Sequence, residues 1–191
     1  MPRFQPRKPN QHYLSELSLD GWENAVLPAS AIDWHSYAYC YRRAADELVA
    51  IFTPPAIGPD GMLLPILFLY RHYLEVSLKG LIIDCADVLG VQAAPPGRHD
   101  LSEIWSRLAP LLTRALPGSN DEWLARLETL VTEFQKLDPT SQTFRYPVGK
   151  DGRLQLVAGF QVSLPLVKET MKDIYFVLDA AAGLLEERQA F

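Results

Sequence analysis

The chain has 191 residues, of which 48% are hydrophobic, so it is long enough to bury one sizeable core. Its net charge is −5 and its pI is near 5.4, so the overall charge of the protein does not attract polyanions. Nucleic-acid binding therefore requires a local basic patch. Basic residues near the amino terminus are followed by prolines and polar residues, where a secretory signal needs a continuous apolar segment. We expect a cytoplasmic protein with one main domain.

The first 28 residues contain four prolines, which predicts an irregular N-terminal arm over residues 1–28 and a helical domain over residues 29–191. Ser30 with Asp33 resembles a capping box, the usual start of a helix. Apolar residues then recur at helical spacing as far as Phe52, where the Thr-Pro-Pro sequence ends the pattern. The expected buried face of this helix comprises Trp34, Tyr37, Tyr41, Ala44, Leu48 and Phe52.

A long apolar run, Leu63 to Leu89, predicts a second helix that Gly90 ends. The run is long enough to span a membrane, but Arg71, Glu75 and Lys79 lie near its centre, where each charge is unfavourable in hydrocarbon by about 2.5–3.5 kcal/mol. No membrane association is expected. Because the helix is apolar on nearly every side, we expect it to be buried in a protein core.

Two further helices follow, each with a capping pattern at its start. Asp100 with Glu103 begins the first of them, and Pro110 is expected to kink or end it. Ser119 with Glu122 begins the second, which closes at residues 138–139. Both helices have apolar residues at helical spacing, so each presents one face to the core.

The pattern changes at residue 143. Residues 143–148 and 153–157 are β-prone and flank a Gly-Lys-Asp-Gly turn, which predicts a small two-stranded flap. Ser163 and Pro165 then begin a final helix. The expected fold class is therefore all-α, an up-and-down helical bundle of about five helices with a short β-hairpin inserted before the last helix.

Arg71, Glu75 and Lys79 are spaced four apart with His72 beside them, so they form a polar stripe on the second helix. Such charges inside a domain must be paired, hydrated in a cleft or used for function. His72 and Glu75 also have the spacing of helical-bundle metal ligands, but no matching pair exists on another helix, so no metal is expected. Phosphate-binding, dinucleotide-binding, zinc and nucleophile-elbow motifs are absent, and no cofactor is expected.

Three sequence segments together resemble the HEPN superfamily of small helical domains. They are Tyr-Leu-Glu-Val-Ser-Leu-Lys-Gly-Leu at 73–81, Gly-Arg-His-Asp-Leu at 97–101 and Phe-Arg-Tyr-Pro at 144–147. The resemblance spans about residues 63–185 and implies a helical bundle that often forms a homodimer. It also implies a role centred on RNA, because many members are ribonucleases of toxin–antitoxin or phage-defence systems, whereas others bind nucleotides or proteins.

The sequence departs from this family at the ribonuclease motif. Active HEPN ribonucleases carry an arginine followed four to six residues later by a histidine. Arg145 could supply the arginine, but Lys150, Asp151 and Gly152 occupy the positions of the histidine. A proton-transferring group would have to come from elsewhere, and the candidates are His72 and His99. The candidate catalytic residues are therefore His99, His72 and Arg145, in a ribonuclease that would need no metal, and whether the protein is an enzyme stays open.

Ligand-binding roles are assigned from side-chain chemistry. Arginine and lysine hold phosphate, and tyrosine stacks on bases. The candidate ligand-binding residues are Arg71, Glu75, Lys79, Tyr146 and Lys150. The alternative is an internal ion-pair network in which the stripe pairs along its helix and Arg145 bonds to Glu75. For His99 the alternative is a hydrogen bond to a neighbouring helix end.

Two classes of function stay open at this level. The first is a HEPN-like protein that binds RNA or nucleotides, either as a ribonuclease with a rearranged site or as a binder without cleavage. The second is a non-catalytic helical dimer that acts as a protein-interaction or regulatory module, with a cognate protein partner. The acidic pI and the missing histidine favour the second class, and a homodimer is consistent with both.

Overall fold

The computed structural model describes residues 25, 27–52, 61–118 and 121–189. The chain divides into two compact units, Met1–Ile32 and Asp33–Phe191. In the first unit the described residues form a short 3-10 helix, η1 (Ala29–Ala31). Of the arm expected over residues 1–28, all but residues 25, 27 and 28 lie outside the described residues.

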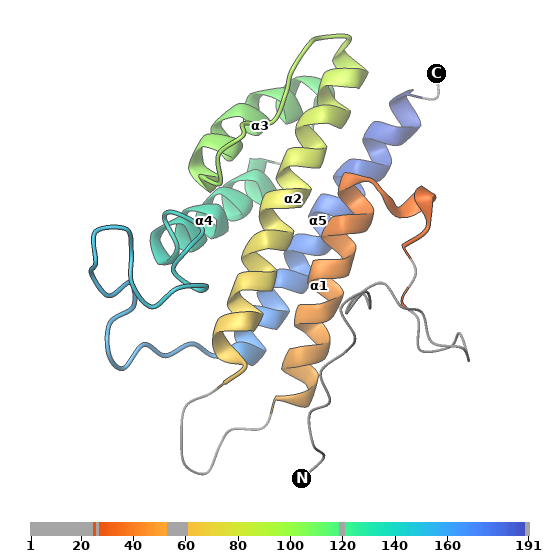
Figure 1. The fold of residues 1–191 in the computed structure, drawn as a ribbon. Helices are drawn as coiled ribbons and strands as arrows, with labels where there is room; N and C mark the ends of the chain where they lie inside the picture. Colours follow the sequence, from red (N-terminus) through yellow and green to blue (C-terminus); the bar gives the residue numbers. More distant parts are fainter. Residues whose placement is uncertain (1–24, 26, 53–60, 119–120, 190–191) are drawn as a thin grey trace, which may run out of the picture. The chain divides into compact units, whose positions relative to one another are not determined.

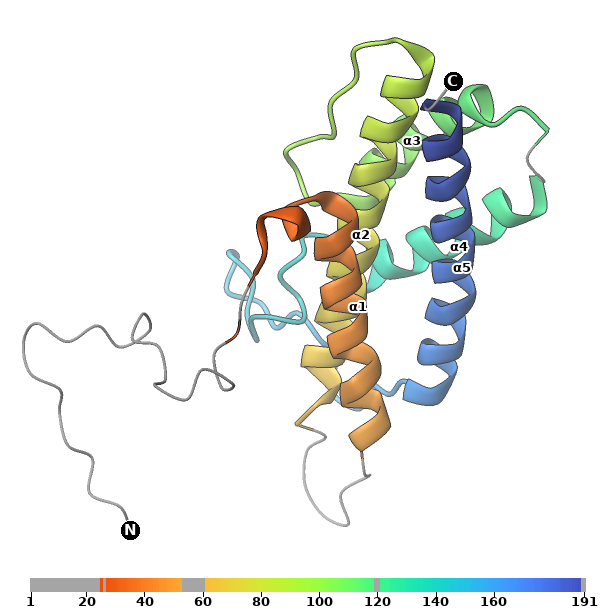
Figure 2. The ribbon, with the colours of Figure 1, turned by 90° about the vertical axis from the view of Figure 1, so that its right-hand side faces the viewer.

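The second unit holds five α-helices and, within the described residues, no β-strand, which confirms the all-α class (Figure 1). The helices are α1 (Trp34–Ile51), α2 (Leu63–Leu89), α3 (Leu101–Ala115), α4 (Asp121–Leu137) and α5 (Leu164–Gln189). Helices α1, α2 and α5 lie side by side, while α3 packs on α2 and α4 packs on α3 (Figures 1 and 2). Helices α1 and α2 run in opposite directions, as in an up-and-down bundle. Helix α5 runs parallel to α2.

Helix α2 is the centre of the fold because it packs against α1, α3 and α5. Most of its side chains between Ile66 and Ala86 are buried, as its nearly continuous apolar sequence predicts. Gly90 ends the helix with a φ of +62°, the left-handed conformation that glycine adopts without steric cost.

Helix α1 buries a narrower face than its sequence predicts. Its N-cap is Asp33, whose carboxylate accepts a hydrogen bond from the Ser36 backbone N–H, so the start lies three residues beyond Ser30. Ala38 and Ala45 are the buried residues of the helix, while Trp34 and Tyr37, which we expected in the core, are 39% and 40% exposed. The small side chains of Ala38 and Ala45 are therefore enclosed in the core, whereas the larger aromatic side chains stay partly exposed.

Helix α3 begins as predicted and ends later than predicted. The Asp100 carboxylate accepts from the Glu103 backbone N–H, which confirms the N-cap. Pro110 does not end the helix, which continues to Ala115. The residues beyond the proline include Leu112 and Ala115, which are buried in the core, so tertiary packing offsets the lost backbone hydrogen bond.

The predicted β-hairpin is wrong. Between α4 and α5 the described chain forms turns, with a single antiparallel bridge between Val148 and Leu154. The glycine-containing turn does form, because the Gly149 N–H donates to the Arg153 carbonyl at 2.9 Å. A ladder does not develop, because Pro147 has no N–H to donate and the residues before it fold into a helical turn on the Gln142 carbonyl.

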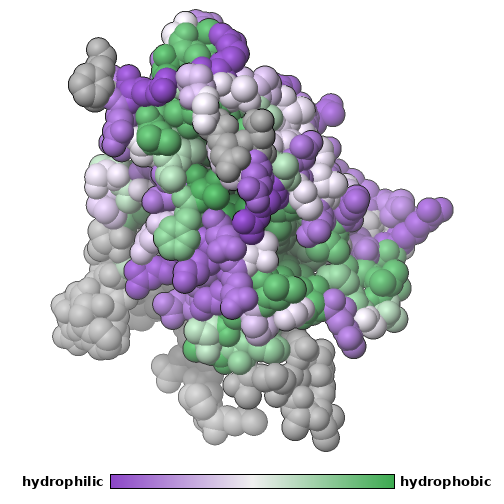
Figure 3. Space-filling model, turned by 180° about the vertical axis from the view of Figure 1, so that it is seen from behind, coloured by the Kyte–Doolittle hydropathy of each residue, from purple (hydrophilic) through white to green (hydrophobic). Residues whose placement is uncertain are grey.

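No helix in the described parts of the chain is long and apolar enough to cross a membrane. Seen from behind the view of Figure 1, the surface carries separate hydrophobic patches among hydrophilic residues (Figure 3). Exposed apolar side chains of α5 include Leu166, Phe176 and Leu184.

Candidate functional site

The charged stripe of α2 is buried and internally paired. Arg71, Glu75 and Lys79 are 1%, 2% and 7% exposed. The Lys79 ammonium donates to Oε1 of Glu75 at 2.9 Å, and Nη1 of Arg71 donates to Oε2 at 3.1 Å. The pairing along the helix that the sequence allowed is therefore present, and its centre is the Glu75 carboxylate.

Arg71 also connects α2 to two other parts of the fold. Its Nη2 donates to the backbone carbonyl of His99 at 2.6 Å, and its Nε donates to the backbone carbonyl of Asp138 at 3.3 Å. The Asp138 carboxylate is fully buried, and its Oδ2 lies 3.3 Å from the same Nε without a hydrogen bond of its own in the described structure. One guanidinium therefore compensates two buried carboxylates and fixes the segment before α3 and the end of α4.

His99 is the member of this cluster that solvent can reach. Its Nδ1 lies 2.7 Å from Oε1 of Glu75, while the side chain is 54% exposed. Burial raises the pKa of Glu75, but hydrogen bonds from Lys79 and His99 outweigh it, so the net pKa is lowered and the carboxylate is charged at neutral pH. A charged acceptor favours the proton on Nδ1, which leaves Nε2 without a partner among the described residues and able to exchange a proton with a ligand.

His72 lies in an aromatic cluster beside this group. Its ring contacts Tyr41 edge-on at a centroid distance of 4.3 Å and stacks on Phe68 at 5.7 Å with an interplanar angle of 7°. Burial lowers the pKa of His72 and outweighs the Glu75 carboxylate, which raises it. His72 is therefore neutral at physiological pH.

Arg145 lies next to Phe68, the residue on which His72 stacks. Its guanidinium lies 5.6 Å from the ring centre of Phe68 and 5.7 Å from that of Tyr146. Its Nε donates to the Ser141 carbonyl at 2.7 Å, and its Nη2 also donates there, so the predicted bond from Arg145 to Glu75 is absent. We call His72, Phe68, Arg145 and Tyr146 the aromatic strip.

The Asp138 side chain holds the start of the loop that carries Arg145. Oδ1 of Asp138 accepts from the backbone N–H groups of Gln142 and Thr143 at 2.8 and 2.9 Å. Because Oδ2 of the same carboxylate faces Arg71, the loop and the charged stripe share one buried residue. The position of Arg145 therefore depends on the network that also fixes His99.

The eight residues selected from the sequence fall into three sets. Four of them, Arg71, Glu75, Lys79 and His99, are in direct contact. His72, Arg145 and Tyr146 belong to the aromatic strip. Lys150 is exposed and, within the described structure, makes no hydrogen bond or ion pair with any of the others.

Sequence reasoning missed Phe68 and Asp138. A signal existed for each: Phe68 precedes His72 by one helical turn, and Asp138 stands before a proline at the end of α4. Neither signal says which distant side chain the residue meets. Within the residues that the structure describes, no group of three or more histidine, cysteine, aspartate or glutamate side chains is arranged to hold a metal ion.

Comparison with known proteins adds no relative. Neither a scan of protein-family models nor searches of curated proteins and of solved structures finds a significant match for this chain.

Proposed function

We propose that the protein is a HEPN-like domain that binds single-stranded RNA across His99 and the aromatic strip. The observation that carries the proposal is the half-exposed imidazole of His99, anchored through Nδ1 on the buried Glu75 carboxylate. An anchored imidazole with a free Nε2 is suited to hydrogen bonding or proton exchange with a ligand. Arg145 and Tyr146, both exposed, supply the groups that a nucleotide needs nearby.

The roles in this proposal differ from residue to residue. Arg145 contacts phosphate, because the residue is exposed and its guanidinium lies beside the two rings. Tyr146 is 53% exposed and offers its ring to a base. Arg71 and Lys79 do not contact RNA, because both are buried on Glu75, and their role is to keep that carboxylate charged and oriented.

Binding is tested by fluorescence anisotropy with labelled single-stranded RNA at two salt concentrations. Arg145→Ala should weaken binding at least fivefold, because phosphate contacts contribute most of the affinity and its salt dependence. The matched control is Arg153→Ala, which removes an arginine with a side chain 87% exposed from the same loop. Equal effects of the two variants would reduce the role of Arg145 to net charge, and wild-type protein that does not bind at micromolar concentration would refute the proposal.

Cleavage is measured on the same RNA by gel electrophoresis without added metal. His99→Asn places an amide donor where Nδ1 bonds to Glu75 but removes Nε2, so it separates anchoring from proton transfer. If wild type cuts RNA and His99→Asn binds without cutting, Nε2 is the proton-transferring atom. If wild type binds without cutting, the protein is an RNA-binding member of this class.

A second candidate function is a protein-interaction module that dimerises or binds a cognate protein. Leu154 and Val157, in the loop that follows Arg145 and Tyr146, are 77% and 78% exposed, which favours a contact surface there. Light scattering after size exclusion should then show a dimer at micromolar concentration that Leu154→Ser with Val157→Ser dissociates. RNA binding that survives both substitutions would separate this surface from the first proposal.

A further inference from the structure

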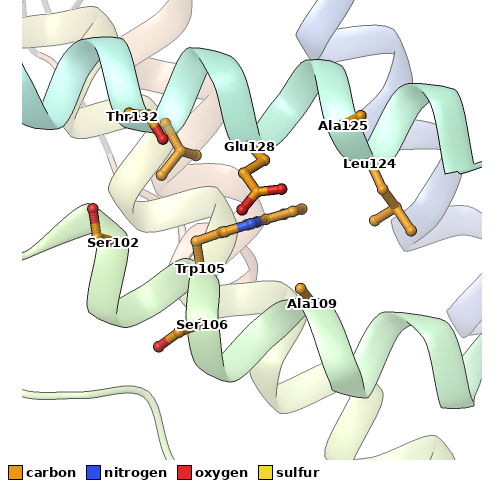
Figure 4. A pocket seen from close by; sticks show the side chains of 9 residues that line it. Ser102, Trp105, Ser106, Ala109, Leu124, Ala125, Glu128 and Thr132 are labelled. Atoms are coloured by element: carbon orange, nitrogen blue, oxygen red, sulfur yellow. The ribbon is translucent and has the colours of Figure 1, made fainter.

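A pocket opens between α3 and α4, apart from the residues discussed so far. Its volume is about 510 Å³, within the range of sites that bind small molecules (Figure 4). The lining residues are Ser102, Trp105, Ser106, Ala109, Leu124, Ala125, Glu128, Val131 and Thr132. They cover two turns of each helix, so the pocket is built entirely from regular elements.

The charge of this pocket is negative. Glu128 is the charged residue of the lining, and no lysine, arginine or histidine lines it. The Glu128 carboxylate has no hydrogen bond or ion pair within the described structure, so it is available to a ligand. The Glu128 carboxylate repels an anion such as a phosphate and attracts a cation.

The remaining lining suits the apolar body of such a cation. Trp105 points from α3 toward α4 beneath the Glu128 carboxylate, and Leu124 points into the same space (Figure 4). An indole ring attracts cations through its electron-rich face, and leucine and alanine side chains contact hydrocarbon. The hydroxyls of Ser102 and Thr132 have no partner among the described residues and can accept from an N–H donor. The Ser106 hydroxyl already donates to the Glu103 carbonyl.

We propose that this pocket binds a small organic cation, an ammonium or guanidinium group attached to an apolar body. The charged group pairs with Glu128, and the apolar body lies against Trp105 and Leu124. The pocket shares no residue with the proposed RNA site and has the opposite charge preference. The failure of one proposal therefore leaves the other standing.

Three probes of similar shape test the charge preference: phenethylamine, 2-phenylethanol and phenylacetate. Binding is followed by NMR, on the indole N–H resonance that disappears in Trp105→Phe. Phenethylamine should bind most tightly and phenylacetate most weakly, with saturable shifts of that resonance. Equal binding of the three probes, or no shift with any of them at millimolar concentration, would overturn the proposal.

Variants test the residue assigned to the charge. Glu128→Gln should weaken phenethylamine binding about fivefold, as expected for one partly exposed ion pair, and should leave 2-phenylethanol unaffected. The matched control is Glu133→Gln, an exposed glutamate on the same helix outside the pocket lining, which should change nothing. Equal losses in the two variants would overturn the assignment. If a capped lysine peptide bound more tightly than phenethylamine, the proposal of a small free cation would be overturned. The ligand would then be a lysine side chain of a protein partner.

Discussion

Nη2 of Arg71 donates to the backbone carbonyl of His99 at 2.6 Å, which joins the middle of α2 to the residue before the α3 cap. The same guanidinium faces Glu75 and Asp138, both almost fully buried. The imidazole proposed to meet RNA is thus positioned by an arginine that RNA cannot reach. Arg71 therefore links the stability of the fold to the proposed site.

Arg71→Met should lower the free energy of unfolding by about 3–5 kcal/mol, because it leaves two carboxylates buried without their shared cation. Urea denaturation followed by circular dichroism measures this loss. The control is Arg107→Met, which breaks an exposed pair with Glu103 and should cost less than about 1 kcal/mol. Equal small losses in the two variants would mean that the buried network contributes little.

The stability contributed by Glu75 should depend on pH in the acid range. Its folded-state pKa is lowered below 4.5, so its contribution is complete above pH 4.5 and is lost as the pH falls through the folded-state pKa. The difference in unfolding free energy between wild type and Glu75→Gln should therefore shrink from pH 6 to pH 3. Thermal melts of both proteins across this range test it. A difference that is constant with pH would contradict the charged state assigned to Glu75.

His35 and Asp84 form a second pH-dependent contact, between α1 and α2. Nε2 of His35 lies 2.9 Å from the Asp84 carboxylate, and this hydrogen bond raises the pKa of His35 above 6.5 despite opposing burial. The stabilisation is complete below pH 6.5 and is lost as the pH rises through the raised pKa. Asp84→Asn should therefore lower the melting temperature more at pH 5.5 than at pH 9. NMR titration of His35 provides a direct check, since its pKa should fall in the variant.

Gly80 allows α1 and α2 to approach each other. A Cβ atom added there would lie 2.9 Å from Cβ of Trp34, too close for the helices to keep their separation. Gly80→Ala should destabilise the fold by about 1–3 kcal/mol. Gly183 is the matched control, because it lies in α5 with open space around its Cβ position, and Gly183→Ala should stabilise by about 0.5–1 kcal/mol. Chemical denaturation of both variants compares the two signs.

The sequence predicted those local features of the fold that depend only on neighbouring residues. It did not predict those that depend on contacts between distant parts of the chain. The Asp100 cap and the Gly90 terminus are decided within a few residues, and both are confirmed. Equally local rules allowed Pro110 to end α3 and placed Trp34 in the core, and neither holds, because α3 continues to Ala115 and Trp34 is 39% exposed. In each case long-range packing decided the outcome: buried residues carry α3 past its proline, and Trp34 stays 39% exposed although its Cβ faces Gly80 of α2.

The sequence by itself determined that α2 is buried and that its charges share one face, because helical periodicity follows from residue spacing alone. Only the tertiary structure decided that these charges pair internally, that His99 comes to Glu75 from 24 residues away and that Arg145 bonds to Ser141 instead. The physical reason is that the free energy of a buried ion pair depends on distance and desolvation, which folding sets and residue order does not encode locally.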